Sequence, residues 1–273
     1  MFRLCHLCLL LALTVGCVFN RSFAPISPSQ IIGSSEQSRK GITALQQGNF
    51  TDAEKLLEDA VRRNKNDINY RRHYAEALWQ QGKHQEALQQ LDEALKRGGQ
   101  NDASLHISLA EKHLALREYT KAYRYADEAV RLNAKDAQCW TLRGRAKRSQ
   151  AIHEAGYAEH TAAMLNQARE DYIRAVSLAS DNGELLAELA TVQLDCGQPE
   201  QALATWLSVQ SLYPQGGEPS EVLIGKTETL VALQRFDEVA TNLMALRQRR
   251  LEGAEMEQRL QRIMTAAQGN MRR

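Results

Sequence analysis

His153, Glu154 and His160 are the residues whose types come nearest to a metal site. Imidazole and carboxylate groups are common zinc ligands, and two histidines seven positions apart can share one face of a helix. A zinc-protease signature instead places two histidines four positions apart with a glutamate between them. Gly156 also interrupts the segment that would have to form this helix. We therefore expect no metal site.

The cysteines give no sign of redox or catalytic chemistry. Cys5 and Cys8 have a CxxC spacing, but they lie in an apolar N-terminal run without the strand and helix that surround a redox motif. Cys139 and Cys196 fall in different repeats of the pattern described below, and we expect two buried free thiols. The sequence has no GxSxG, Walker A or dinucleotide-binding motif. We therefore expect no catalytic residues and no cofactor, and we do not interpret the chain as an enzyme.

Cys17 is a candidate for lipid attachment. Arg3 gives the chain a positive start, and residues 4–15 form an uncharged apolar run that is shorter than the roughly 20 residues needed to cross a bilayer. The run ends in Val15-Gly16-Cys17, which resembles the lipobox of bacterial lipoproteins, although Thr14 stands where that family usually has leucine. The resemblance implies cleavage before Cys17 and a diacylglycerol on its thiol.

Two segments therefore precede the body of the protein: a signal peptide over residues 1–17 and a tether over residues 18–33. The lipoprotein resemblance implies a membrane-anchored protein of the cell envelope that faces the periplasm. A conventional cleaved signal, giving a soluble secreted or periplasmic protein, and an uncleaved anchor are the alternatives.

The overall composition favours helices and limits the possible partners. Ala, Leu, Gln, Glu and Arg predominate and the chain has five prolines, a composition that suits helix better than sheet. The chain has 34 Lys and Arg residues against 33 Asp and Glu residues. A nucleic-acid-binding protein needs a basic stripe that neutralises phosphates. We therefore expect no nucleic-acid partner.

A repeated pattern of small and large residues dominates the sequence from residue 34 onward. In each repeat a small or aliphatic residue, here called the anchor, is followed by apolar or small residues four and seven positions later, which places all three on one helix face. A second periodic helix precedes each anchor, with a short turn between. The anchors are Ala53, Ala87, Ala122, Ala168, Ala202 and Val239, spaced 34, 35, 46, 34 and 37 residues apart.

This pattern resembles the tetratricopeptide-repeat (TPR) family. The resemblance implies an all-α fold, a right-handed superhelical solenoid of about six TPR helix hairpins with a C-terminal capping helix. The TPR array spans 34–253, with units at 34–67, 68–101, 103–136, 137–182, 183–216 and 220–253, and the capping helix and tail occupy 254–273. The fourth unit is longer than the others, which predicts two lengthened helices. These form either a tolerated insertion or an accessory binding lip near Ile152 and Tyr157.

In TPR proteins the first helix of each repeat lines a concave groove that binds partner proteins. The resemblance therefore implies a partner-binding groove in this chain. The first four units supply arginines to it and the last two are acidic, so either a charge gradient orients the partner or the groove is a solvated face with unrelated charges. The candidate groove residues are Arg39, Asn69, Arg72, His73, Glu76, Trp79, Glu111, Arg145, Arg148, Glu188, Asp195 and Glu228.

The sequence thus predicts a membrane-tethered TPR scaffold of the bacterial envelope that binds protein partners of unknown identity. The array behind a lipobox-like signal also resembles the pilotin lipoproteins of type IV pilus assembly, which is a more specific hypothesis. The alternative is a soluble or anchored regulatory subunit that associates with itself.

Overall fold

The computed structural model describes residues 28–153, 158–214, 217–249 and 253–271, and the regular elements in these ranges are all helices. Cys17, the signal peptide and the tether up to residue 27 lie outside the described residues. Helix α1 begins at Pro28, so residues 28–33 are helical and the predicted tether is too long at its C-terminal end. Proline suits this position because the first turn of a helix leaves its backbone N–H groups unpaired. The chain divides into two compact units, one ending at Gly82 and one beginning at Lys83.

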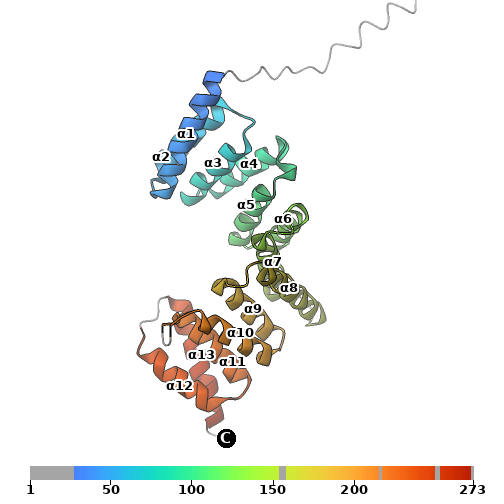
Figure 1. Ribbon diagram of the computed structural model, residues 1–273, viewed down its shortest axis with the longest axis vertical. Helices are drawn as coiled ribbons and strands as arrows, with labels where there is room; N and C mark the ends of the chain where they lie inside the picture. The colour runs from blue at the N-terminus through green and yellow to red at the C-terminus, as the bar shows by residue number, and fades with distance from the viewer. Residues whose placement is uncertain (1–27, 154–157, 215–216, 250–252, 272–273) are drawn as a thin grey trace, which may run out of the picture. The chain divides into compact units, whose positions relative to one another are not determined.

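The first unit contains three helices (Figure 1): α1 Pro28–Gln46, α2 Phe50–Arg63 and α3 Ile68–Gln80. Helices α1 and α2 form a hairpin, and α3 packs against α2. Ala44, Ala53, Leu57 and Ala77 make the small core. Gln81 ties α3 to α2, because its Nε2 donates a hydrogen bond to the Glu54 carboxylate at 2.8 Å and another to the Phe50 carbonyl at 3.2 Å.

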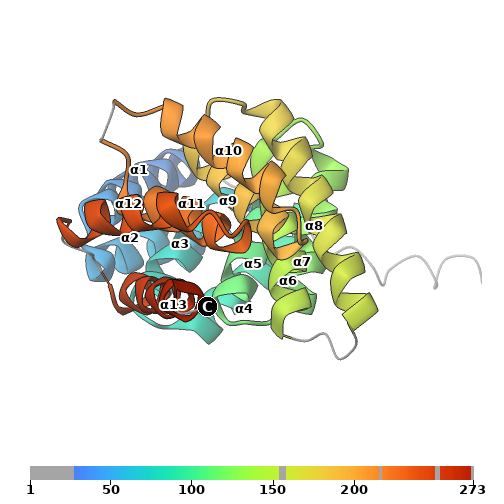
Figure 2. The ribbon, with the colours of Figure 1, turned by 90° about the horizontal axis from the view of Figure 1, so that it is seen from below.

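The second unit continues the hairpin pattern, and Figure 2 shows α10 lying alongside α9. The first helices of four pairs begin at residues 103, 137, 183 and 220, the starts proposed from the sequence for those units. The helices of this unit are α4 His84–Lys96, α5 Ala103–Ala115, α6 Tyr119–Leu132, α7 Ala137–His153, α8 Ala158–Leu178, α9 Gly183–Asp195, α10 Pro199–Ser211, α11 Ser220–Ala232, α12 Phe236–Arg247 and α13 Ala254–Met271. A short 3₁₀ helix, η1 Gly99–Asn101, precedes α5.

The anchor residues lie at the contacts between helices, as the spacing predicts. Each of them is completely buried, and the residues four and seven positions after each anchor are buried as well. A small side chain there lets two helices approach closely, while the large neighbour four positions on fills the space beside it. The hairpins therefore share apolar cores, and the chain is an all-α helical solenoid.

The turns within five hairpins use one backbone conformation, the left-handed region. The residue five positions before the anchor has a positive φ in each: Gly48 (76°), Gly82 (77°), Arg117 (60°), Gly197 (71°) and Gln234 (57°). This residue ends the first helix, and its N–H donates a hydrogen bond back to a carbonyl of the last turn. Glycine adopts this conformation without steric cost, whereas arginine and glutamine do not.

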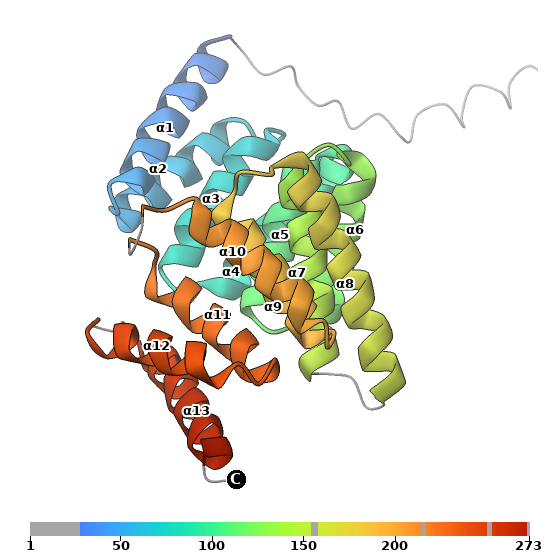
Figure 3. The ribbon, with the colours of Figure 1, turned by 60° about the horizontal axis from the view of Figure 1, so that its bottom comes forward.

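The fourth hairpin has the lengthened helices that the sequence predicts, and Figure 3 shows α7 and α8 running side by side. They contain 17 and 21 residues, against 13 or 14 in helices α2 to α6. The end of α7 packs on the start of α6, where the ring of His153 stacks on Tyr119 at 5.2 Å. Ile152 is 51% exposed, as expected, and Tyr157 lies outside the described residues.

Helix α13 closes the C-terminal end of the second unit by packing on α11 and α12. Its Ile263 and Ala267 enter the core formed by these helices. Both cysteines of the described chain are free, as predicted. Cys139 is buried, but Cys196 is partly exposed, which corrects the prediction of two buried thiols. Cys196 follows the last residue of α9, where the chain turns and covers the side chain less completely.

Candidate functional site

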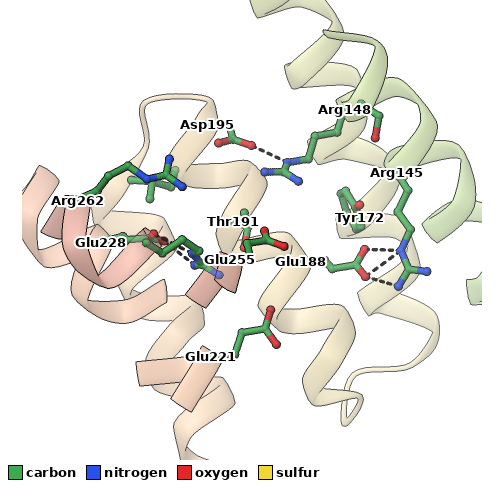
Figure 4. Close-up of a pocket in the computed structure, with 13 residues that line it drawn as sticks. Arg145, Arg148, Tyr172, Glu188, Thr191, Asp195, Glu221, Glu228, Glu255 and Arg262 are labelled. Carbon is green, nitrogen blue, oxygen red and sulfur yellow. Dashed lines mark hydrogen bonds and ion pairs between the residues drawn. The ribbon is translucent and has the colours of Figure 1, made fainter. Parts of the chain in front are cut away.

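A cavity of about 480 Å³ opens on the first helices of the second unit, and we call it the central cavity. Helices α7, α9, α11 and α13 each supply part of its wall, and Tyr172 of α8 lies at its base (Figure 4). Its lining is dominated by charged side chains. The residues that line it are Arg145, Arg148, Ser149, Tyr172, Glu188, Thr191, Leu194, Asp195, Glu221, Glu228, Glu255, Arg259 and Arg262.

Arg145 forms the most extensive ion pair in the central cavity. Its Nε donates to both carboxylate oxygens of Glu188 at 2.9 Å, and its Nη2 donates to Glu188 and, at 3.0 Å, to Glu184. The hydrogen bonds that Arg145 donates to the Glu188 carboxylate raise the pKa of Arg145 above its usual value. Burial, with a further contribution from Glu188, raises the pKa of the Tyr172 hydroxyl well above 10. The ion pair joins α7 to α9, whereas the neutral state of the Tyr172 hydroxyl follows mainly from its burial.

Two further ion pairs join the helices around the cavity. The Nε of Arg148 on α7 donates to Asp195 at 2.6 Å, at the end of α9. On the opposite wall, Arg259 of α13 makes a two-point contact with Glu228 of α11, with distances of 2.9 and 2.6 Å. Two parallel hydrogen bonds fix the planar guanidinium relative to the carboxylate. The walls of the cavity are therefore held by cross-helix pairs.

Glu221, Glu255 and Arg262 line the same cavity without an ion pair to any described residue. Figure 4 shows Glu221 and Glu255 beside the cavity with no dashed line to a partner. All three are exposed. Because the three pairs above neutralise the other charges, two free carboxylates and one free guanidinium remain, and the cavity has a net negative character.

Arg145 also links the central cavity to its neighbours. It lines a second cavity of about 240 Å³ beside Glu111 and Glu184, and a third of about 600 Å³ that Tyr119 and His153 also border. A fourth cavity of about 340 Å³ shares Glu188, Thr191 and Glu221 with the central one. Each cavity therefore shares side chains with its neighbour. Their combined lining extends from α5 to α13, and we call this series of cavities along the first helices of the unit the groove.

The structure brings part of the predicted groove together. Arg145, Arg148, Glu188, Asp195 and Glu228 line the central cavity. Glu111 lies beside Arg145 in the adjoining cavity, and its carboxylate accepts a hydrogen bond from Gln138 at 3.0 Å. The remaining six predicted residues belong to the first unit, where they lie on α1 and α3: Arg39, Asn69, Arg72, His73, Glu76 and Trp79.

In the first unit, local contacts involve several of these side chains. Arg72 donates to the Asn69 amide oxygen at 3.1 Å, and Gln80 donates to Glu76 at 2.6 Å. Burial, reinforced by the charge of Arg72, lowers the pKa of His73. His73 is therefore neutral at pH 7 and does not add to the positive charge of this helix.

The charge gradient expected along the groove needs a correction for the second unit. Arg145 and Arg148, which the sequence assigns to a basic section, are paired with Glu188 and Asp195 from the acidic section. Opposite charges on α7 and α9 attract once the helices stack, so the two sections neutralise one another. The unpaired charges of Glu221, Glu255 and Arg262 therefore determine the net charge of the central cavity.

The capping helix contributes side chains that the sequence did not assign to the site. Glu255, Arg259 and Arg262 of α13 line the cavity, as does Tyr172 from a second helix. Glu255, Arg259 and Arg262 are four and three residues apart, which places them on one helix face. This spacing is the feature of the sequence that indicates a charged face on α13. From its sequence, this helix is expected to have a capping role and no part in the groove.

The three residues whose types come nearest to a metal site do not assemble among the described residues. His153 stacks on Tyr119, His160 is exposed on α8, and Glu154 lies outside the described ranges. Within those ranges the histidine, cysteine and acidic side chains form no group of three with the geometry of a metal site. The described helices also include none with the length and apolar character required to cross a bilayer.

Stacked helical hairpins with a groove along their first helices define a class of repeat scaffolds. Two family models described as tetratricopeptide repeat match residues 38–103 and 183–207. The chain is a TPR protein. The comparison with curated proteins found no match.

Solved structures with the same fold include three bacterial proteins. PilW, described as a widely conserved type IV pilus biogenesis factor, is 14% identical with a TM-score of 0.70, covering 82% of this chain and 97% of that chain. PilF of Pseudomonas aeruginosa is 15% identical with a TM-score of 0.68, covering 84% and 97%. MamA of Desulfovibrio magneticus RS-1 is 19% identical with a TM-score of 0.56, covering 66% and 94%. At these identities the likeness concerns the fold.

Proposed function

We propose that this TPR protein is a non-catalytic scaffold that holds a segment of a partner protein in its central cavity. The observation that carries the proposal is the cavity itself, which three successive first helices, α7, α9 and α11, and the capping helix α13 line with charged side chains. Its three cross-helix ion pairs fix the positions of these side chains before a partner binds. A pre-organised groove lowers the entropic cost of binding an extended or helical segment.

The free charges define the chemistry of the partner segment. Glu221 and Glu255 carry carboxylates without an ion-pair partner among the described residues, next to the already paired Arg259. A lysine or arginine on the bound segment would satisfy them. Arg262 offers a site for an acidic or carbonyl group close by. The partner therefore presents a basic side chain toward α11 and α13.

Reversal of the two free carboxylates tests this proposal. The Glu221→Lys, Glu255→Lys double variant should weaken capture of the partner from the source organism about tenfold, because attraction becomes repulsion. It should leave helix content unchanged, since neither residue is in an ion pair. Glu58→Lys with Glu86→Lys is the matched control, because these exposed residues of second helices give the same change in net charge. Equal capture by both double variants would reject the central cavity as the binding site.

We also propose that the scaffold is tethered to a membrane of the cell envelope through a lipid on Cys17. The support is the apolar run that ends at Cys17 in the sequence. Two acyl chains hold a protein on a membrane far better than one. The wild type should therefore sediment with membranes after a salt wash, whereas Cys17→Ala should be released with its helix content intact. Equal fractionation of the two proteins, or an intact Met1 in the mature protein, would reject the lipid anchor.

A role in type IV pilus biogenesis is the more specific version of this function. The observation that favours it is the likeness to PilW over 82% of the chain and to PilF over 84%. Deletion of the gene should then abolish surface pili, and the Cys17→Ala protein should restore them poorly. Normal piliation in the deletion strain would exclude this version and leave the binding scaffold unaffected.

A further inference from the structure

The exposed face of the second helices changes character between the first three repeats and the last three. At the position five residues after the anchor, repeats one to three carry Glu58, Asp92 and Asp127, whereas repeats four to six carry Ile173, Leu207 and Met244. The three apolar side chains are 44%, 50% and 67% exposed. We call Ile173, Leu207 and Met244 the apolar row.

The charged neighbours change together with this position. In the first three repeats, the residue six positions after the anchor forms an ion pair with the residue nine positions after it. These pairs are Asp59 with Arg62, Glu93 with Lys96, and Glu128 with Arg131. The last three repeats have Arg174, Ser208 and Ala245 in the first of these positions and Ser177, Ser211 and Gln248 in the second. Helices α8, α10 and α12 therefore lack the ion pair that α2, α4 and α6 carry at these two positions.

The serine hydroxyls beside the apolar row are satisfied within their own helices. The Ser177 hydroxyl donates to the Arg174 carbonyl at 2.7 Å, and the Ser208 and Ser211 hydroxyls donate to carbonyls of α10 at 3.1 and 2.7 Å. Burial of this surface would therefore leave no serine hydroxyl without an acceptor, so that its desolvation costs little.

We propose that the apolar row on α8, α10 and α12 is the contact surface for a second copy of this chain. If the two-fold axis of the dimer runs along the row, Ile173, Leu207 and Met244 each contact the same residue of the second copy. An uncharged side chain can contact its own copy without electrostatic repulsion. An acidic residue at this position, as in the first three repeats, would instead face a like charge. Self-contact therefore accounts for the loss of charge from all three repeats.

The size of this surface suits a dimer of modest affinity. A helix of 13 residues such as α10 is about 20 Å long. Helices α8 and α10 both pack on α9, and α10 and α12 both pack on α11, so neighbouring second helices lie about 10–20 Å apart and their three exposed faces span about 600–1,000 Å² in projection. Stable interfaces bury about 800 Å² on each partner. The second helices carry the row, whereas the first helices and α13 carry most of the central cavity. The inference therefore does not depend on the proposed partner groove.

Sedimentation equilibrium of the full chain tests the inference, with Cys17→Ala as the common background so that acyl chains do not hold molecules together. This background protein should form a dimer. Adding Leu207→Glu should raise the dissociation constant by at least about 30-fold, the effect of losing an interface hot spot. Gln89→Glu, an equal charge change on the exposed face of α4, should leave it unchanged. If Leu207→Glu lowers the melting temperature, the dissociation constant is measured for Ile173→Glu instead.

Two results would overturn the self-contact. One is a background protein that remains monomeric at the highest concentration tested, and the other is a Leu207→Glu variant that dimerises as tightly as the background. A monomer that binds phosphatidylglycerol vesicles, and loses this binding on Leu207→Glu, would assign the apolar row to a membrane surface instead. Partner capture by the central cavity is measured separately, so its failure is distinguishable from the failure of the dimer.

Discussion

The left-handed turn residues show how one position in each repeat restrains the chain. Three of the five turns place glycine there, but Arg117 has a φ of 60° and Gln234 a φ of 57°. A left-handed conformation costs an L-residue roughly 1–2 kcal/mol. Arg117→Gly should therefore raise the free energy of unfolding by about 1 kcal/mol, measured by urea denaturation. Gly82→Ala should lower it by a similar amount, and a change of the same sign in both variants would refute the argument.

The anchors make a second prediction for single residues. Ala87 is fully buried where two helices meet, while Gln89, two positions later on the same helix, is exposed. Ala87→Leu should overpack this contact and lower the free energy of unfolding by about 1–3 kcal/mol. Gln89→Leu places the same leucine side chain in solvent and should have little effect. Similar shifts of the thermal midpoint in the two variants would mean that the repeat register is wrong.

Single residues also show why the sequence predicts the core better than the site. The anchors follow from spacing alone, because burial in a repeat depends on the helical period. Arg145 lines the central cavity, but its pairing with Glu188 does not follow from the sequence. These residues are 43 positions apart, and their contact depends on how α7 stacks on α9. Likewise, Arg143 pairs with Asp171 across α7 and α8 at 2.6 Å without any local signal.

At the scale of helices, Gly225 and Trp206 determine how closely α11 packs on α10. A Cβ atom on Gly225 would lie 2.2 Å from Cζ2 of Trp206, a distance that the buried indole cannot accommodate without moving. Gly225→Ala should therefore lower the free energy of unfolding by about 1–3 kcal/mol despite the better helix propensity of alanine. The check is urea denaturation followed by circular dichroism.

Gly269→Ala is the matched control for this helix contact. A Cβ atom on Gly269 meets no atom within 4 Å, and the residue is exposed on α13. Alanine there should stabilise the chain by up to about 1 kcal/mol, because glycine loses more backbone entropy in a helix. Stabilisation by both substitutions would contradict the close packing of α10 and α11.

The number and order of the helices were predictable, but the second role of α13 was not. Its apolar residues indicated a capping helix, and Ile263 and Ala267 do pack against α11 and α12. Glu255 and Arg259, which lie two turns and one turn before Ile263 on the adjacent face of α13, line the central cavity. That role depends on the crossing of α13 over α11, which the periodicity of either helix does not determine.

At the scale of the whole molecule, the residues of the core and those of the proposed binding site vary differently from repeat to repeat. The buried anchors and their neighbours use similar apolar residues in every repeat, whereas the residues of the central cavity differ from one first helix to the next. Each hairpin contributes one strip of surface, so a bound segment that spans several hairpins would contact several strips at once. The central claim is therefore that recognition takes place in the groove of the first helices.

Site-specific photo-crosslinking tests that claim most directly. Thr191 lies on α9 and lines both the central cavity and the adjoining one, so a crosslinking residue in its place faces any bound segment. The same residue at Gln89 sits on the exposed face of a second helix. In cells, the Thr191 position should form an adduct with a partner protein, and Glu221→Lys with Glu255→Lys should abolish it, while the Gln89 position should form none. An adduct of equal yield from Gln89, or one from Thr191 that survives the charge reversal, would contradict recognition in the groove.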